Sequence, residues 1–293
     1  SGESSAGNPI SITHPVTVDL TPAAITINTI ATDDVINAAE KGADLTLSGT
    51  TTNVEPGQTV TVTFGGKNYT ASVASDGSWT ATVPAADLAA LPEGSASAQA
   101  SVSNINGNSA SAVHNYSVDS SAPTIIINTV ASDNIVNASE ADTGVTVSGS
   151  TTAEAGQIVT VTLNSPTVQT YQATVQADGS WSITIPAADL EALTDGSHTL
   201  TATVNDKAGN PASTTHNLAV DLTVPVLTIN TIAGDDIINA AEHGQALVIS
   251  GSSTGGEAGD VVTVTLNSKT YTTTLDASGN WSVGVPAADV TAL

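Results

Sequence analysis

The chain contains no cysteine, no methionine and no arginine. Without cysteine it can form neither disulfides nor thiolate sites for zinc, so a rigid extracellular protein of this composition needs another way to hold its domains. Its only bases are 4 lysines, which stand against 28 acidic residues and leave a net charge of −24. This imbalance argues against nucleic acid and anionic membranes as partners, because lysine and arginine supply most of the affinity for both. The partners that such a chain favours are cations.

Long apolar runs are also missing. No stretch approaches the roughly 18 residues of a membrane span, and the start, SGESSAGNPIS, lacks the basic and apolar regions of a signal peptide. We therefore expect this sequence to be part of a longer protein. The abundant residues are Thr, Ser, Val, Ala and Ile in alternation, a pattern that predicts β-strands rather than disorder.

The sequence repeats itself with a period of about one hundred residues. The stretches VDLTPAAITINTIA from Val18, VDSSAPTIIINTVA from Val118 and VDLTVPVLTINTIA from Val220 align, as do DGSWTATVPAADL, DGSWSITIPAADL and SGNWSVGVPAADV. A period this long indicates tandem domains rather than a short-period solenoid. The predicted boundaries are 1–19 for the last strand of a preceding repeat, 20–119 for unit 1, 120–221 for unit 2, and 222–293 for unit 3, which lacks its last two strands.

Unit 2 shows the expected pattern of a single repeat. Alternating residues predict seven strands, separated by turn signals such as ADGS, TDGS and DKAGN, and PAADLEAL predicts at most one helical turn. The predicted strands are 124–130, 145–150, 158–164, 171–176, 181–186, 198–204 and 213–220. Seven short antiparallel strands in this length suit a two-sheet sandwich. The fold class is therefore all-β, with tandem immunoglobulin-like sandwiches arranged as an elongated rod.

An acidic stretch recurs in each unit, as TDDVINAAEKG at 32–42, SDNIVNASEAD at 132–142 and GDDIINAAEHG at 234–244. It follows the first strand, so we expect it at the C-terminal tip of its unit, where the seventh strand also ends. The facing tip of the next unit then carries the second-third loop, the fourth-fifth turn and the sixth-seventh loop, with acidic and amide residues in each. Carboxylates from two successive units therefore converge on each junction.

Carboxylates at this density repel one another unless a cation neutralises them. Calcium fits best, because it binds six to eight oxygens of carboxylates, amides and carbonyls in flexible geometry. We predict two kinds of calcium site. The first lies within each acidic loop, at Asp33, Asp34, Asn37, Glu40, Asp133, Asn134, Asn137, Glu140, Asp235, Asp236, Asn239 and Glu242. The second bridges neighbouring units, through Asp119 and Asp221 to facing loops that include Asp178 and Asp206.

The alternative is that Asp, Asn and Gly simply favour turns. A single loop of this kind would be interpreted as a turn, because it does not match the EF-hand pattern. Three matched copies with a glutamate at a fixed offset favour calcium. Unit 1 has SNINGNS where unit 2 has NDKAGNP, so either Asn104 or Asn106 replaces Asp206 there.

Other recurring residues are interpreted as structural. The three tryptophans, and the tyrosines Tyr69, Tyr171 and Tyr271, recur with the repeat, which predicts core packing rather than a sugar-stacking platform. His14, His114 and His216 recur on the seventh strand, each alone in its unit, and are read as structural. No HExxH, GxSxG, P-loop or dinucleotide fingerprint occurs.

On the motifs VDxxxP, INTI, DDxIN…E, DGSW, PAADL and DxAGN, the whole chain resembles the bacterial Ig-like repeats of giant surface adhesins, most of all the biofilm-associated and SiiE-type proteins of Gram-negative enterobacteria. The resemblance implies type I secretion to the cell surface or beyond it, tens of tandem domains, calcium at and near the junctions, and a role in attachment, biofilm formation and virulence.

Three functions follow in order of preference. The first is a spacer in which calcium locks successive sandwiches into a rod that holds a distal binding domain away from the cell. The second is a module that itself binds a host glycan or protein, for which a ligand site should break the repeat symmetry. The third is an enzyme, such as a glycosidase with paired carboxylates. It is disfavoured because these acids are copied in every unit and lie at tips.

Overall fold

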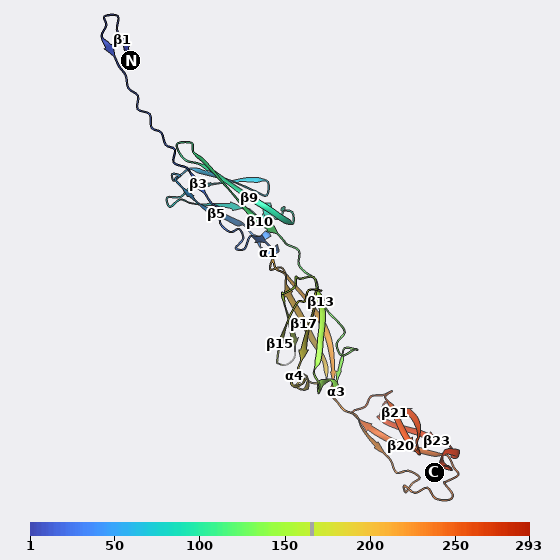
Figure 1. Cartoon of the computed structure of the whole chain (residues 1–293). Helices are drawn as coiled ribbons and strands as arrows, with labels where there is room; N and C mark the ends of the chain where they lie inside the picture. The colour runs from blue at the N-terminus through green and yellow to red at the C-terminus, as the bar shows by residue number, and fades with distance from the viewer. Residues whose placement is uncertain (165–166) are drawn as a thin grey trace.

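The structure is a computed structural model and describes residues 1–164 and 167–293. Three β-sandwiches follow one another along an elongated chain, and the N-terminal segment extends from one end, as Figure 1 shows. Each sandwich has a buried core of its own, and these cores lie within residues 25–118, 125–220 and 249–290. The predicted all-β class with tandem sandwiches is confirmed.

Unit 2 consists of two packed sheets. The three-stranded sheet has the order β11 (Ile125–Ile127), β13 (Val145–Thr151), β16 (Ser180–Ile185). The five-stranded sheet has the order β12 (Ile135–Asn137), β18 (Pro211–Asp221), β17 (Gly196–Asn205), β14 (Ile158–Asn164), β15 (Gln169–Thr174). Two short helices, α3 (Ala138–Ala141) and α4 (Ala187–Glu191), lie at the tip that faces unit 3.

Unit 1 repeats this arrangement. Its three-stranded sheet contains β3 (Ala24–Ile25), β5 (Leu45–Thr52) and β8 (Ser78–Val83), and its five-stranded sheet contains β4 (Val35–Ile36), β10 (Ser109–Val118), β9 (Gly94–Ser103), β6 (Thr59–Phe64) and β7 (Lys67–Ser72). The helices are α1 (Ala38–Lys41) and α2 (Ala85–Leu88). Unit 3 contains β19 (Val226–Ile229), β20 (Leu247–Thr254), β21 (Val261–Leu266), β22 (Lys269–Thr274), β23 (Asn280–Val285) and α5 (Ala287–Val290).

The structure adds elements that the sequence did not predict. The acidic loop of unit 2 contains β12 and α3, so unit 2 has eight strands in its described residues instead of seven. β12 pairs in parallel with β18, whereas every other strand of that sheet is paired antiparallel. A three-residue strand is too short to show alternation, and this is why the pattern of apolar residues missed it.

Few residues of the N-terminal segment form strands. β1 (Gly2–Glu3) pairs with β2 (Pro9–Ile10), and residues 11–23 have no strand assignment. Ile12 is 90% exposed and Val16 is 79% exposed. Within residues 1–19, which were predicted to be the last strand of a preceding repeat, the strand pairing that the structure describes is that of β1 with β2. None of the helices in residues 1–164 and 167–293 is long and apolar enough to cross a membrane.

A tryptophan packs against a glycine at the same place in each core. Trp79, Trp181 and Trp281 are at most 4% exposed, and each lies directly opposite a glycine on the neighbouring strand, in the pairs Gly49↔Trp79, Gly149↔Trp181 and Gly251↔Trp281. A β-carbon on Gly149 would lie 1.9 Å from the Ile126 carbonyl oxygen and 2.5 Å from the Trp181 ring. Only glycine fits there, and the predicted core role of the tryptophans is confirmed.

The recurring tyrosines attach the helical turn to a hairpin. The hydroxyl of Tyr69 donates to Asp87 at 2.8 Å, and Tyr171 and Tyr271 donate in the same way to Asp189 and Asp289. Burial, and secondly the hydrogen bond to Asp87, raise the pKa of Tyr69 to about 12. Lys67 forms an ion pair with Asp87 in unit 1, and Lys269 forms one with Asp289 in unit 3.

We predict that Gly149→Ala destabilises unit 2 by about 3 kcal/mol, because the added methyl group collides with backbone and indole atoms that cannot both move. Urea unfolding of the whole chain, followed by tryptophan fluorescence, measures this loss as an earlier transition. Ser150→Ala, which changes the exposed side chain of the next residue, should alter the free energy of unfolding by less than about 0.5 kcal/mol. Equal midpoints for the two variants would contradict this description of the core.

Candidate functional site

The first two acidic positions of each loop are bound to their own backbone. The Asp33 carboxylate accepts from the Val35 N–H at 3.0 Å, and the Asp34 carboxylate accepts from the Ile30 N–H at 2.8 Å. Asp34 has a φ of 66°, a left-handed conformation that Asp and Asn tolerate better than most residues. The other loops repeat these contacts, with Asp133 and Asn134 in unit 2 and Asp235 and Asp236 in unit 3.

The histidine of the last strand contacts this loop. His114 Nε2 lies 2.7 Å from Asp34 Oδ1, and His216 Nε2 lies 2.7 Å from Asn134 Oδ1. Both histidines connect the last strand to the acidic loop, a contact that the sequence interpretation did not specify, whereas His14 is exposed. The hydrogen bond from Ile30, and secondly that from His114, keep the pKa of the Asp34 carboxyl below its usual range.

The second half of the loop is a helix cap. Asn37 precedes α1, its side chain accepts from the Glu40 N–H, and the Glu40 carboxylate accepts from the Asn37 N–H at 3.1 Å. This reciprocal pair is a capping box, and it recurs as Asn137 with Glu140 and as Asn239 with Glu242. Capping therefore accounts for the fixed offset of the glutamate. The sequence interpretation had explained this offset by calcium alone.

The residues predicted to form the calcium site of the acidic loop lie at two different places. Asp33 and Asp34 line a shallow concavity with Ser95, Ser97 and Asn115 on the side of unit 1. Asn37 lies at the tip, because the parallel pairing of β4 with β10 sets Ile36 opposite Val118 and lets the Asp119 N–H donate to the Ile36 carbonyl at 3.0 Å. In unit 2 the same pairing places Asn137 directly opposite Asp221.

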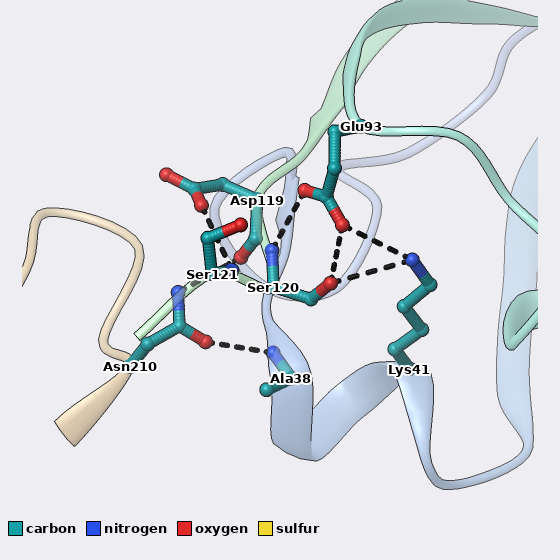
Figure 2. A network of polar contacts seen from close by, with 7 residues as sticks. All are labelled: Ala38, Lys41, Glu93, Asp119, Ser120, Ser121 and Asn210. Atoms are coloured by element: carbon teal, nitrogen blue, oxygen red, sulfur yellow. Dashed lines mark hydrogen bonds and ion pairs between the residues drawn. The ribbon is translucent and has the colours of Figure 1, made fainter. Parts of the chain in front are cut away.

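Unit 2 contacts this tip of unit 1 through its sixth-seventh loop. Figure 2 shows Asn210 between the two units: its Oδ1 accepts from the Ala38 N–H at 2.8 Å, and its Nδ2 donates to the Asp119 carbonyl at 2.9 Å. Gly209 lies so close to the Asn37 side chain that an added β-carbon would be 3.6 Å from Asn37 Nδ2. At this junction the sixth-seventh loop of unit 2 thus contacts the acidic loop of unit 1 and the linker through their backbone groups.

Asp206 holds Asn210 in place. Its carboxylate accepts from the Asn210 N–H at 2.8 Å and from Asn210 Nδ2 at 2.9 Å, and Asp206 is 7% exposed. In unit 1, Asn104 takes this position, since its side chain accepts from the N–H groups of Asn106 and Asn108. Asn104, and not Asn106, is therefore the counterpart of Asp206.

A second carboxylate clamps each linker, and the sequence interpretation did not include it. Glu93 accepts from the Ser120 N–H at 2.9 Å and from the Ser120 hydroxyl, and Lys41 donates to Glu93 at 3.2 Å (Figure 2). Asp195 accepts from the Leu222 N–H and the Thr223 hydroxyl in the same way. The hydrogen bonds of the linker hydroxyls are the first cause that lowers the pKa of both carboxyls. The aligned turns PEGS and TDGS were the available signal.

The next junction gathers acidic groups in one concavity. Asn137, Asp221, Glu257 and Asp260 line it together with the linker residue Thr223. Asp221 comes from unit 2 and the other two carboxylates come from the second-third loop of unit 3. Across residues 1–164 and 167–293, however, no three His, Cys, Asp or Glu side chains come together as a metal-binding group.

The fourth-fifth turns use their acids locally. Asp178 accepts from the N–H of Ser180 at 3.0 Å and from its hydroxyl at 2.6 Å, and the hydroxyl bond is the first cause that lowers the pKa of Asp178. Asp276 accepts from the N–H groups of Ser278 and Asn280. The hydrogen bonds of Asp178 stay within its own turn, and those of Asp276 do the same.

Comparison with known proteins gives a consistent set of similarities. The bacterial Ig-like domain profile matches residues 121–222. A Ca2+-stabilized adhesin that helps an Antarctic bacterium reach out and bind ice is 38% identical over 99% of this chain and 73% of its own, with a TM-score of 0.48. A structure from a 1.5-MDa bacterial ice-binding adhesin, concerned with host cell surface retention, is 37% identical over 94% of this chain and 90% of its own, with a TM-score of 0.45.

A tetra-tandem repeat from the extending region of a large adhesion protein is 29% identical over 91% of this chain and 67% of its own, with a TM-score of 0.33. The comparison with curated protein sequences gives no match.

We predict that Asp34 makes unit 1 sensitive to acid. Its folded pKa is lowered, so its stabilisation is present above the unfolded value of about 3.9 and is lost as the pH falls through the folded value. Asp34→Asn gives unit 1 the residue of unit 2 and should remove this dependence, while Asn134→Asp should introduce it into unit 2. Urea midpoints at neutral and acidic pH measure both effects, and parallel profiles for parent and variants would contradict the assignment.

Proposed function

Because this chain belongs to the bacterial Ig-like domain family, whose members include tandem repeats of large bacterial adhesins, we propose that it is a spacer segment of a surface adhesin. The supporting observation is the end-to-end contact of unit 1 with unit 2, in which loops of both units and the linker share hydrogen bonds. Such contacts extend a chain in one direction and hold a binding domain elsewhere in the parent protein away from the cell. The relatives are adhesins, and this supports a structural rather than an enzymatic role.

We propose that calcium stiffens the junctions. The acidic residues at the tips offer carboxylate and carbonyl oxygens, which calcium prefers, and cysteine is absent from the chain. At the first junction Asn37, Glu40, Asp119 and Asp206 would hold the ion, and at the second Asn137, Asp221, Glu257 and Asp260 would do so. One of the relatives is described as Ca2+-stabilized, which supports the same assignment here.

Calcium would supply positive charge and coordination bonds that carboxylates from two units share. Two of these carboxylates are held by residues of the chain itself: the capping box orients Glu40, and Asn210 donates to the Asp206 carboxylate. Without the ion, the uncompensated negative charges at each tip repel one another across the linker.

The proposed role also suits secretion. A chain with a net charge of −24 whose junctions are less rigid at low cytosolic calcium would stiffen further at the millimolar concentration outside the cell, the range in which extracellular modules bind calcium. On the resemblance noted above, we propose export by type I secretion from a Gram-negative bacterium and a role in attachment and biofilm formation.

We predict that millimolar calcium lengthens the chain in solution and raises its melting temperature, and that excess chelator reverses both changes. Small-angle X-ray scattering and a thermal melt in each buffer measure the two effects. A paired variant, Asp119→Asn with Asp206→Asn, should lose most of the calcium-dependent gain at the first junction, because amides keep the shape but not the charge.

Asp178→Asn is the matched control, since Asp178 is engaged within its own turn, and it should respond to calcium as the parent does. Scattering curves and melts that are the same with calcium and with chelator would overturn the proposed calcium role, and leave the acidic loops as caps and turns.

A further inference from the structure

We propose that Asn210 is a latch that fixes the orientation of unit 2 on unit 1 without a bound cation. The inference rests on the proposed spacer function and adds to it a second, direct source of rigidity. Asn210 is 1% exposed, and its amide group is used at both ends across the junction. A buried side-chain amide that bridges two domains holds one relative arrangement, because rotation of either domain leaves its polar atoms without partners.

The amide has one favourable orientation. Its oxygen faces a donor, the Ala38 N–H, and its nitrogen faces two acceptors, the Asp119 carbonyl and the Asp206 carboxylate. Exchange of the amide oxygen and nitrogen would bring like groups together at all three contacts. Asp206 belongs to the same loop as Asn210, so unit 2 presents the amide already oriented to the tip of unit 1.

The tip of unit 1 is formed to receive it. Ala38 is the first residue of α1, where backbone N–H groups have no partner within the helix. Asn37 caps the Ala39 and Glu40 N–H groups, which leaves the Ala38 N–H for the facing unit. Unit 1 therefore donates one of its own helix-end hydrogen bonds to unit 2, a contact that needs no metal.

The same contact recurs at the other end of unit 1. Asn108, the counterpart of Asn210, donates from Nδ2 to the Asp19 carbonyl at 3.2 Å, and Asn106 donates to the Asp19 carboxylate at 2.7 Å. Asp19 is the counterpart of Asp119 in the sequence repeat. The contact from this asparagine to the linker carbonyl is thus present at two successive linkers, even though Asn104 replaces Asp206 beside one of them.

The test measures the spread of distances between unit 1 and unit 2 in excess chelator. Because the chain has no cysteine, spin labels can be placed at the exposed positions Gln99 and Thr215 through Gln99→Cys and Thr215→Cys, and double electron–electron resonance gives the distance distribution. The latch predicts a narrow distribution for the parent, and a distribution about twofold broader for Asn210→Ala, since domains without a fixed interface reorient freely.

A second variant acts from the other unit. Ala38→Pro removes the N–H that Asn210 binds, at a first helical position where proline is well tolerated, and should also broaden the distribution. Ala138→Pro, at the equivalent position of unit 2, and Asn217→Ala, an exposed asparagine of β18, are the matched controls and should leave it narrow. Circular dichroism verifies that each variant folds.

If the chelated parent is already as broad as Asn210→Ala, the latch is overturned, whatever calcium does. If the parent is narrow and neither Asn210→Ala nor Ala38→Pro broadens it, the latch is equally overturned. The calcium role is judged separately, by whether adding calcium narrows the distribution of Asn210→Ala, so the two proposals fail through different observations.

Discussion

The parallel pairing of a very short strand with the last strand of its unit governs the arrangement of the polar groups. β4 beside β10, and β12 beside β18, bring the second half of the acidic loop to the point where the chain leaves the unit. The capping box, the linker aspartate and the first turn of a helix then share one tip. Without this pairing the acidic loop would be a surface turn on the side of the sandwich, and the next unit would meet only the linker.

Two opposing electrostatic features meet at this tip. The carboxylates repel one another in a chain with only 4 bases, whereas hydrogen bonds from backbone N–H groups, hydroxyls and Asn210 satisfy many of their oxygens. Lys41 is one of the few bases, and it lies at the first junction, 84% shielded and paired with Glu93. The local bonds give each carboxylate a fixed place, and a cation would compensate the charge that they leave.

The sequence was sufficient for the architecture and for the place of the candidate site, and insufficient for its details. Alternation in strands such as 158–164 predicted sandwiches, because the alternation of apolar and polar residues reflects which side chains are buried. Strand direction alone predicted that the sixth-seventh loop, in which Asn210 lies, faces the end of the strand that carries Asp119.

The capping boxes were not predicted because the pattern Asn–x–x–Glu is compatible with a metal-binding loop as well as with the start of a helix. The roles of Glu93 and Asp195 were not predicted because their partners are backbone N–H groups and hydroxyls of linkers that are distant in the sequence. The spacing of residues does not reveal such contacts. The alignment of the repeats left two candidates in unit 1, Asn104 and Asn106, for the counterpart of Asp206. Only the hydrogen bonds in the structure identified Asn104.

The central claim is that the junctions, and not the sandwiches alone, set the extended form of the chain. Residual dipolar couplings of the 15N-labelled chain in millimolar calcium test it most directly, because each unit reports its own alignment. The account predicts that the couplings of unit 1 and unit 2 fit a single alignment tensor with the two units in their described orientation. Tensors of clearly different magnitude for the two units would show independent motion and contradict it.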